Sequence, residues 1–169
     1  MLNRTSIHPE HAMELRSPAF EPGGAVPQRH TGDGADASVP LSWSDAPAGT
    51  AEFALIVDDP DAPTDEPWVH WVVYGLPEDT RELPEGIPRG ESPAPLRGAF
   101  QGVNSFSDDR IGYRGPAPPR GHGPHHYRFT LYALRRRLDL PPGVTKEELV
   151  DAMNGLVLDT ARLTGVYER

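Results

Sequence analysis

Over most of this chain, apolar residues occur in short runs separated by turn-forming residues. Residues 52–57 form the most apolar run and lead directly into an Asp/Pro-rich stretch, and residues 68–76 are dense in valine and aromatic side chains. Such runs are typical of β-strands. We predict a third long strand at 127–134 and two shorter ones at 13–20 and 41–43.

One helix is expected near the C-terminus. Thr145 suits the N-cap position, and Glu148 three residues later completes the signature of a capping box. The apolar residues that follow keep helical spacing, at Leu149, Met153, Leu156, Val157, Leu163 and Val166. We therefore predict a helix over residues 145–166, weakened at Gly155 by about 1 kcal/mol relative to alanine.

The order of these elements predicts a mainly β fold. Strands separated by turns and followed by one late helix favour a β-sandwich with a few short peripheral helices, because parallel βαβ units would need helices between the strands. A chain of 169 residues suits a single domain. Within it, residues 1–10 are expected to form a loose N-terminus, and residues 77–102, which hold five prolines, a long loop.

Composition excludes several classes of protein. Sixteen Lys and Arg against 25 Asp and Glu give a net charge of −9, so the chain lacks the basic face that nucleic acids and anionic membranes require. The absence of cysteine excludes disulfides and thiolate metal sites. The sequence contains neither a signal-peptide pattern at its start nor a transmembrane segment. We expect a cytoplasmic protein.

Two neighbouring segments carry candidate chemistry. The acidic stretch at 58–63, Asp-Asp-Pro-Asp-Ala-Pro, follows the most apolar strand, and His70 lies inside the next strand. Asp and Pro are also common in solvated surface turns, so this stretch is equally consistent with a plain turn. A histidine in an apolar strand must be hydrogen-bonded or neutral, because burying its charge is costly. A core histidine with satisfied hydrogen bonds is therefore the simplest interpretation of His70.

A third segment, residues 112–127, combines Gly/Pro-rich sequence with histidines and a tyrosine. If the strand that follows begins at His125, then His125, Tyr127, Phe129 and Leu131 share one face, because strand side chains alternate. That face is apolar, which places His125 at the rim of the core. The preceding turns offer backbone amides that suit an anion, although a plain connecting loop has the same composition.

Taken in order, these motifs resemble one family. The matching segments cover most of the chain from about residue 13 to 167 and read Ser-Pro-Ala-Phe (17–20), Pro-Leu-Ser-Trp (40–43), Asp-Asp-Pro-Asp-Ala-Pro (58–63), His-Trp (70–71), Gly-Pro-Ala-Pro-Pro (115–119) and His-His-Tyr (125–127). They resemble the phosphatidylethanolamine-binding protein family, in its bacterial branch of Raf kinase inhibitor-like proteins.

This resemblance implies a fold, a site and partners. It implies two antiparallel β-sheets with short helices at the edges, and a small cavity for phosphate-like anions or phospholipid head groups. The residues that would form the cavity are Asp59, Asp61, His70, Gly115, Pro119, His125 and Tyr127. Many members have arginine where this chain has His126, and Arg114 or Arg128 are the candidates to replace that charge. Bacterial members often pair, so a homodimer and a regulated protein partner are also expected.

Two aspartates in an anion cavity need an explanation, since a carboxylate repels a phosphate by about 4 kcal/mol at 4 Å with an effective dielectric of about 20. Either an aspartate holds a histidine as imidazolium, or it meets the ammonium of an ethanolamine head group. Our hypothesis is that His70 and His125 donate to a phosphate oxygen, Tyr127 adds a hydroxyl, and Asp59 sets the histidine charge. It predicts tighter binding as pH falls through about 6.5.

Three other functions remain open. Asp59, Asp61, His70, His122 and His125 offer oxygen and nitrogen ligands for a metal-dependent hydrolase, although no helical pair of ligands is present. A serine hydrolase is disfavoured, because the chain has no Gly-x-Ser-x-Gly elbow. A protein-interaction module is compatible with anion binding. The basic run Arg135–Arg137 is interpreted as protection of a sheet edge, or as a partner contact.

Overall fold

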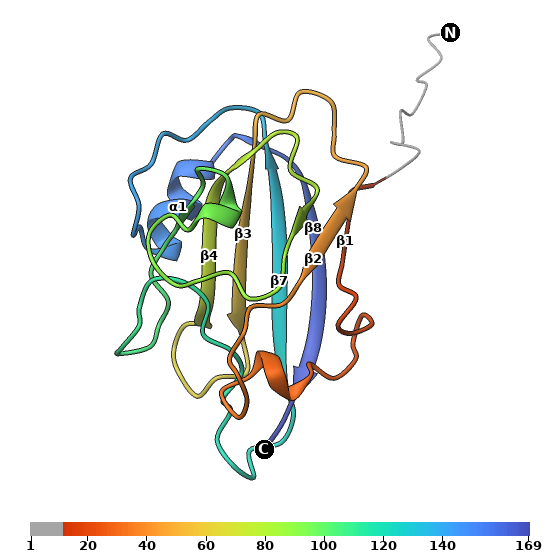
Figure 1. Ribbon diagram of the computed structural model, residues 1–169, viewed down its shortest axis with the longest axis vertical. Coiled ribbons are helices and arrows are strands. Elements are labelled where there is room, and N and C mark those ends of the chain that lie inside the picture. Colours follow the sequence, from red (N-terminus) through yellow and green to blue (C-terminus); the bar gives the residue numbers. More distant parts are fainter. Residues whose placement is uncertain (1–11) are drawn as a thin grey trace, which may run out of the picture.

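The computed structural model describes residues 12–169, which form eight strands, one α-helix and two 3₁₀ turns (Figure 1). In chain order these are β1 (Glu14–Arg16), η1 (Gln28–His30), β2 (Leu41–Ser44), β3 (Glu52–Asp59), β4 (Trp68–Pro77), β5 (Glu82–Leu83), η2 (Ala94–Leu96), β6 (Phe100–Gln101), β7 (His125–Leu134), α1 (Lys146–Met153) and β8 (Val157–Tyr167). The expected loose segment at 1–10 lies outside the described residues.

The strands form two antiparallel sheets, which confirms the predicted mainly β fold. The smaller sheet has the order β1-β2-β5, and the larger has the order β6-β4-β3-β7-β8. Antiparallel pairing joins β3 to both β4 and β7. Because β3 is central, it is buried along its whole length, which explains its continuous apolar sequence.

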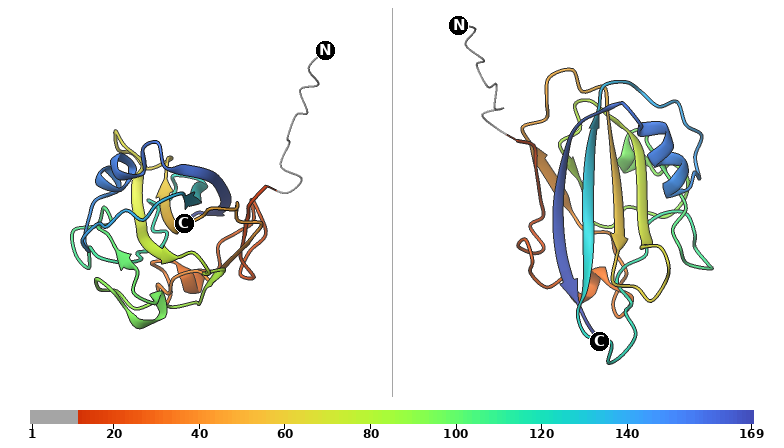
Figure 2. Two further views of the ribbon diagram at one scale, coloured as in Figure 1. Left: turned by 90° about the horizontal axis from the view of Figure 1, so that it is seen from above. Right: turned by 180° about the vertical axis from the view of Figure 1, so that it is seen from behind.

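Both faces of the large sheet are covered, and alternate residues of β3 point to opposite sides. Phe53, Leu55 and Val57 pack toward the small sheet in the main core. Ala54 and Ile56 pack on the other side in a second cluster with α1. Figure 2 shows these layers from above and from behind, with α1 and the small sheet on opposite sides of the long strands.

The predicted helix at 145–166 is correct only in its first half. Thr145 forms the capping box with Glu148, and α1 ends at Met153. Gly155 adopts a left-handed φ of +77°, and the chain then pairs with β7 as β8. The buried positions there, Ala161 and Leu163, have the period of two that a strand requires, which the helical spacing of the other apolar residues obscured.

The remaining expectations differ from the structure in detail. The strand expected at 13–20 is limited to Glu14–Arg16, and the loop expected at 77–102 contains the two-residue strands β5 and β6. The long strand begins at His125, and the alternate residues His125, Tyr127, Phe129 and Leu131 are all buried. None of the helices formed by residues 12–169 has the length and apolar character needed to cross a membrane.

Candidate functional site

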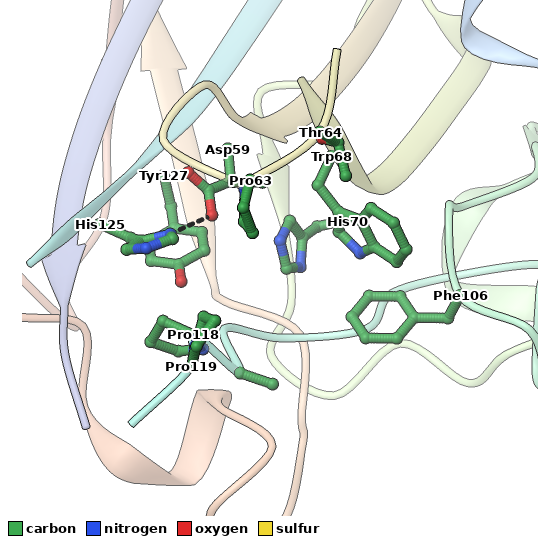
Figure 3. A pocket seen from close by; sticks show the side chains of 12 residues that line it. Asp59, Pro63, Thr64, Trp68, His70, Phe106, Pro118, Pro119, His125 and Tyr127 are labelled. Carbon is green, nitrogen blue, oxygen red and sulfur yellow. Dashed lines mark hydrogen bonds and ion pairs between the residues drawn. The ribbon is translucent and has the colours of Figure 1, made fainter. Parts of the chain in front are cut away.

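One end of the large sheet carries a cavity of about 220 Å³ (Figure 3). Antiparallel pairing brings the last residue of β3, Asp59, beside the first residues of β7, His125 and Tyr127. On the other side of β3, the pairing of Asp59 with Trp68 brings His70 to the same end. Three segments far apart in the sequence thus meet at one opening.

Five of the seven residues that the resemblance implies line this cavity: Asp59, His70, Pro119, His125 and Tyr127. The rest of the wall is largely apolar and consists of Ala62, Pro63, Thr64, Trp68, Phe106, Ala117 and Pro118. Polar groups on the strands therefore face an opening framed by prolines and aromatic rings (Figure 3).

A chain of three side chains runs along one wall. The Nδ1 atom of His125 lies 2.6 Å from the Oδ2 atom of Asp59, and both side chains are buried. The other Asp59 oxygen, Oδ1, accepts the backbone N–H of Asp61 at 2.8 Å. On its far side, His125 Nε2 lies 2.6 Å from Nδ1 of the exposed His122. Asp59 thus fixes the orientation of His125, since both of its oxygens are engaged.

His70 sits deeper and is held in a neutral form. Its Nδ1–H donates to the carbonyl oxygen of Arg114 at 2.6 Å, since a carbonyl can only accept. The neutral ring then presents Nε2 as an acceptor. Burial lowers the pKa of His70 below its ordinary value, despite this hydrogen bond and nearby carboxylates. Without a ligand, the neutral ring is thus favoured, and donation from His70 to a phosphate oxygen stays a prediction that requires the ring to take up a proton.

Tyr127 supplies the cavity's unpartnered donor. Its side chain is 1% exposed, and its hydroxyl has no hydrogen-bond partner among the described residues. Its ring packs edge-on against His70, with centroids 5.2 Å apart, and its hydroxyl points toward Pro118 and Pro119 (Figure 3). Burial raises the pKa of Tyr127 far above its ordinary value, so the hydroxyl remains protonated.

Asp61 does not reach the cavity. Its Oδ2 atom accepts the backbone N–H of His126 at 2.8 Å and lies 2.8 Å from the ring Nδ1 of the same residue. Burial raises the pKa of Asp61, but the two His126 hydrogen bonds outweigh burial and the net shift is downward. His126 thus connects the acidic turn to β7.

Gly115 also lies outside the cavity wall and positions the loop that forms it. Its N–H donates to Oδ1 of Asp36 at 2.7 Å, and Oδ2 of Asp36 lies 2.7 Å from Arg89 and 3.4 Å from Arg114. A Cβ at position 115 would overlap the carbonyl oxygen of His30. Glycine is therefore required for this close approach.

The loop that leads into β7 is also held by Arg169, near the end of β8. The guanidinium of Arg169 forms two contacts with the Asp33 carboxylate, Nε to Oδ2 at 3.0 Å and Nη2 to Oδ1 at 2.8 Å. The carbonyl oxygen of Arg169 accepts the N–H of Gly121 at 3.3 Å. The residue beside His122 is thus anchored to the chain terminus.

Comparison with known proteins identifies the family. The family described as "Phosphatidylethanolamine-binding protein" matches residues 16–168. The chain belongs to the phosphatidylethanolamine-binding protein family. Among its relatives, a protein of Aquifex aeolicus named "UPF0098 protein" is 45% identical over 158 residues, which cover 93% of this chain and 89% of the relative.

Solved structures agree with this membership. A phosphatidylethanolamine-binding protein homologue, CT736 of Chlamydia trachomatis, is 40% identical with a TM-score of 0.82, covering 94% of this chain and 98% of that one. YbcL of E. coli, described as a new member of the mammalian family, is 32% identical with a TM-score of 0.85, covering 94% of this chain and 99% of YbcL.

Arg128 and Arg114, the candidates to replace the family's arginine, serve other carboxylates. Arg128 donates to both oxygens of Asp58, from Nε at 2.7 Å and from Nη2 at 3.0 Å, and Lys146 Nζ donates to Oδ2 at 2.9 Å. Arg114 stacks over Phe106, with its guanidinium carbon 4.6 Å from the ring centroid. Neither arginine belongs to the cavity wall of this family member.

Sequence reasoning missed the aromatic part of the wall. Trp68 and Phe106 pack edge to face with centroids 5.5 Å apart, and Phe106 packs in the same way against His70 at 5.5 Å. The apolar run at 68–76 predicts only a strand at Trp68, and no pattern in the sequence singles out Phe106. The spacing of Trp68 and His70, two apart on one strand, is the signal that could have placed both on one face.

The residues of the metal-hydrolase alternative are engaged with one another instead. Asp59 is bonded to His125 and the Asp61 N–H, and His70 Nδ1 is bonded to a carbonyl oxygen. Among residues 12–169, no group of three or more His, Asp and Glu side chains is arranged to hold a metal ion. The geometry therefore does not support that alternative.

Proposed function

We propose that the cavity binds a phosphate-type anion, either free or as a phospholipid head group, and that the protein acts through this binding rather than through catalysis. The observation that carries the proposal is the Tyr127 hydroxyl, a buried donor that has no hydrogen-bond partner among residues 12–169 and lies beside two histidines. A buried unpaired hydroxyl is costly. An anionic oxygen in the cavity would satisfy it.

The carboxylate in the wall does not oppose this proposal. Asp59 is buried and accepts hydrogen bonds from His125 and from the Asp61 N–H, so its negative charge is already compensated. Asp61 is turned toward His126. In this scheme Asp59, His125 and Tyr127 act at the cavity, and Asp61 and Gly115 position the segments that form it.

His70 links the proposed binding to a proton. In its neutral form it presents an acceptor at Nε2, so a ligand oxygen placed there needs its own proton, or the ring must take one up. A phosphate monoester carries such a P–OH below its second pKa of about 6. Either route favours binding at lower pH, which is the direction that the sequence predicts. The proton is then carried by the ligand or taken up by His70 on binding, whereas the sequence hypothesis has a histidine that is already charged.

The apolar walls favour an esterified phosphate. Pro63, Trp68, Phe106 and Pro118 flank the polar groups, and apolar surface has little to offer an inorganic ion. An organic stem on the phosphate would bury apolar area against these side chains, at about 25 cal/mol per Å². Phosphorylethanolamine should therefore bind more tightly than inorganic phosphate.

Calorimetry with three ligands tests the proposal. Phosphorylethanolamine should bind most tightly, inorganic phosphate more weakly, and both should weaken as pH rises from about 5.5 to 8, across the ordinary histidine pKa. Sulfate, which has no proton to donate at these pH values, should bind less tightly than phosphate. Equal affinity for sulfate and phosphate would show that the ring takes up the proton and that the ligand does not carry it. An affinity that does not change with pH would contradict the role given to His70. Absence of binding by all three ligands would contradict the proposed function.

A further inference from the structure

Two buried carboxylates lie on one face of β3, and their surroundings differ. Asp58 is bonded to Arg128 and Lys146. Glu52, six positions earlier on the same strand face, is only 2% exposed. Its Oε1 atom accepts the backbone N–H of Leu138 at 3.3 Å, and the backbone N–H of Gly75 also stabilises the charged carboxylate. Its Oε2 atom is buried and has no partner with hydrogen-bond geometry among the described residues.

Glu52 forms part of the wall of a second cavity of about 210 Å³. Its neighbours there include Tyr74, Phe100, Arg137 and Asp139. Glu52 and Asp59 stand at opposite ends of β3, so the two cavities are about 23 Å apart at a rise of about 3.3 Å per residue. Figure 1 shows β3 running from the top of the molecule, where the segment after β7 crosses, to the bottom.

The chemistry of this wall favours a cation. A buried carboxylate is costly unless it is paired, and hydrogen bonds to a charged donor are stronger than those to a neutral one. The rings of Tyr74 and Phe100 lie with centroids 6.2 Å apart, and aromatic faces attract ammonium groups. The Tyr74 hydroxyl is already committed to the carbonyl oxygen of Pro141 at 2.5 Å, so it does not satisfy Glu52.

Two exposed charged groups modify this cavity. Burial raises the pKa of Glu52, and the negative charge of Asp139, in the covering segment, acts in the same direction. The backbone N–H groups of Leu138 and Gly75 and the positive charge of Arg137 lower the pKa of Glu52. Arg137 makes no ion pair within residues 12–169. Because Arg137 also lines the cavity, its guanidinium competes with a cationic ligand for Glu52.

We infer that this second cavity is a site for a small primary alkylammonium ion. The ammonium group donates to Glu52 Oε2, and its short alkyl stem packs between Tyr74, Phe100 and Leu138. The size of the cavity limits the stem to a few carbons. This site is independent of the proposed anion cavity, because it shares no lining residue with it.

Titration of the full chain with n-butylammonium chloride tests the inference, observed by backbone amide NMR. The amides of Gly75 and Leu138, in the wall, should shift with saturation, and those of the Asp59 cavity should not. The isosteric variant Glu52→Gln keeps the shape and removes the charge, so the affinity should fall about tenfold or more. Arg137→Ala removes the internal competitor, so the affinity should rise.

n-Butanol is the neutral control, since it matches the stem and lacks the charge. Saturation by n-butanol with equal affinity would overturn the inference, and so would binding of n-butylammonium that is unchanged in Glu52→Gln. The amide spectrum of Glu52→Gln reports directly whether the variant is folded. Should that variant fail to fold, Asp139→Asn gives a second test. It removes a negative charge from the cavity, so the affinity for n-butylammonium should fall. An affinity for n-butylammonium that changes in neither Asp139→Asn nor Arg137→Ala would overturn the inference.

Discussion

The Nδ1 atom of His122 lies 2.6 Å from the Nε2 atom of His125, and the two rings are 4.9 Å apart at their centroids. The opposite nitrogen of His125 is bonded to Asp59. Both nitrogens of His125 are therefore engaged within the protein. An anion that approaches Nε2 has to replace His122, which sits on an exposed loop between two glycines with positive φ.

His122→Ala should therefore bind phosphate more tightly than the parent chain. The substitution frees His125 Nε2 for one hydrogen bond with phosphate, in which either a P–OH donates to the neutral ring or the protonated ring donates to a phosphate oxygen. A net hydrogen bond of about 1 kcal/mol corresponds to about a fivefold change in the dissociation constant. Calorimetry at one pH measures the effect. The phosphate affinity of His122→Asn, which can retain a hydrogen bond to His125, should lie between that of the parent chain and that of His122→Ala. Weaker binding by His122→Ala would show that His122 contacts the ligand instead.

Tyr127→Phe should separate binding from stability. The Tyr127 hydroxyl is buried and has no hydrogen-bond partner in the described part of the chain, so its removal should leave the free energy of unfolding unchanged or slightly increased. Phosphate affinity should fall about fivefold to tenfold, since one donor is lost. Denaturant unfolding and calorimetry on the same preparation measure both quantities.

Tyr113→Phe is the matched control for that substitution. Tyr113 is also buried, but its hydroxyl donates to the carbonyl oxygen of His30 at 2.6 Å. Its removal should cost about 1 kcal/mol of stability and leave phosphate affinity unchanged. The proposed role of Tyr127 is refuted if both variants bind phosphate equally well.

His70 should titrate below the ordinary histidine value of about 6.5 in the ligand-free protein. Burial lowers its pKa, so the unfolded chain takes up a proton at higher pH than the folded one. Stability should accordingly decrease as pH falls from about 6.5 toward the folded pKa. NMR of the imidazole nitrogens measures the midpoint and should find the proton on Nδ1. A midpoint at or above 6.5 without phosphate would contradict the assignment.

Asp58→Asn should destabilise the fold by about 3 kcal/mol at neutral pH, because it leaves Arg128 and Lys146 without their shared carboxylate. Burial raises the pKa of Asp58, but the hydrogen bonds and charges of Arg128 and Lys146 together have a larger effect in the opposite direction. The pKa of Asp58 is therefore lowered overall. The stabilisation is thus present above the unfolded value of about 3.9 and is lost as pH falls below it. Urea unfolding curves of the two proteins should converge in acid.

The control for Asp58→Asn is Asp79→Asn. Asp79 also pairs with an arginine, Arg97, at 3.1 Å, but both side chains are largely exposed. Exposed pairs contribute little, so the urea midpoint should stay close to that of the parent chain. An equal loss in both variants would mean that burial does not set the strength of the Asp58 cluster.

The sequence was most informative where burial and alternation coincide. Apolar runs predict strands at 52–57, 68–76 and 127–134, and the structure extends them to 52–59, 68–77 and 125–134. The motifs at the ends of these strands contribute residues to the cavity. The strand β8 was missed because its buried face contains Ala161, Leu163 and Gly165, which are too few and too small to oppose the apparent helical spacing. This segment forms a strand because it pairs with β7, and a local sequence pattern does not show such a long-range contact.

The charges of the site could not be predicted from residue types. The orientation of the Asp61 side chain depends on a backbone N–H of His126. The placement of the His70 proton on Nδ1 depends on the carbonyl group of Arg114. Both partners are main-chain groups, which every residue provides. The sequence thus identifies most of the side chains that meet at the opening. Their hydrogen-bond partners and protonation states can be assigned only from the three-dimensional structure.

The anchoring of Arg169 has a practical consequence for anyone preparing this protein. Its carbonyl group holds Gly121, and its guanidinium is fixed by Asp33. A purification tag fused directly after Arg169 adjoins the loop that carries His122. Measurements on cleaved, untagged material are the appropriate reference for every titration described above.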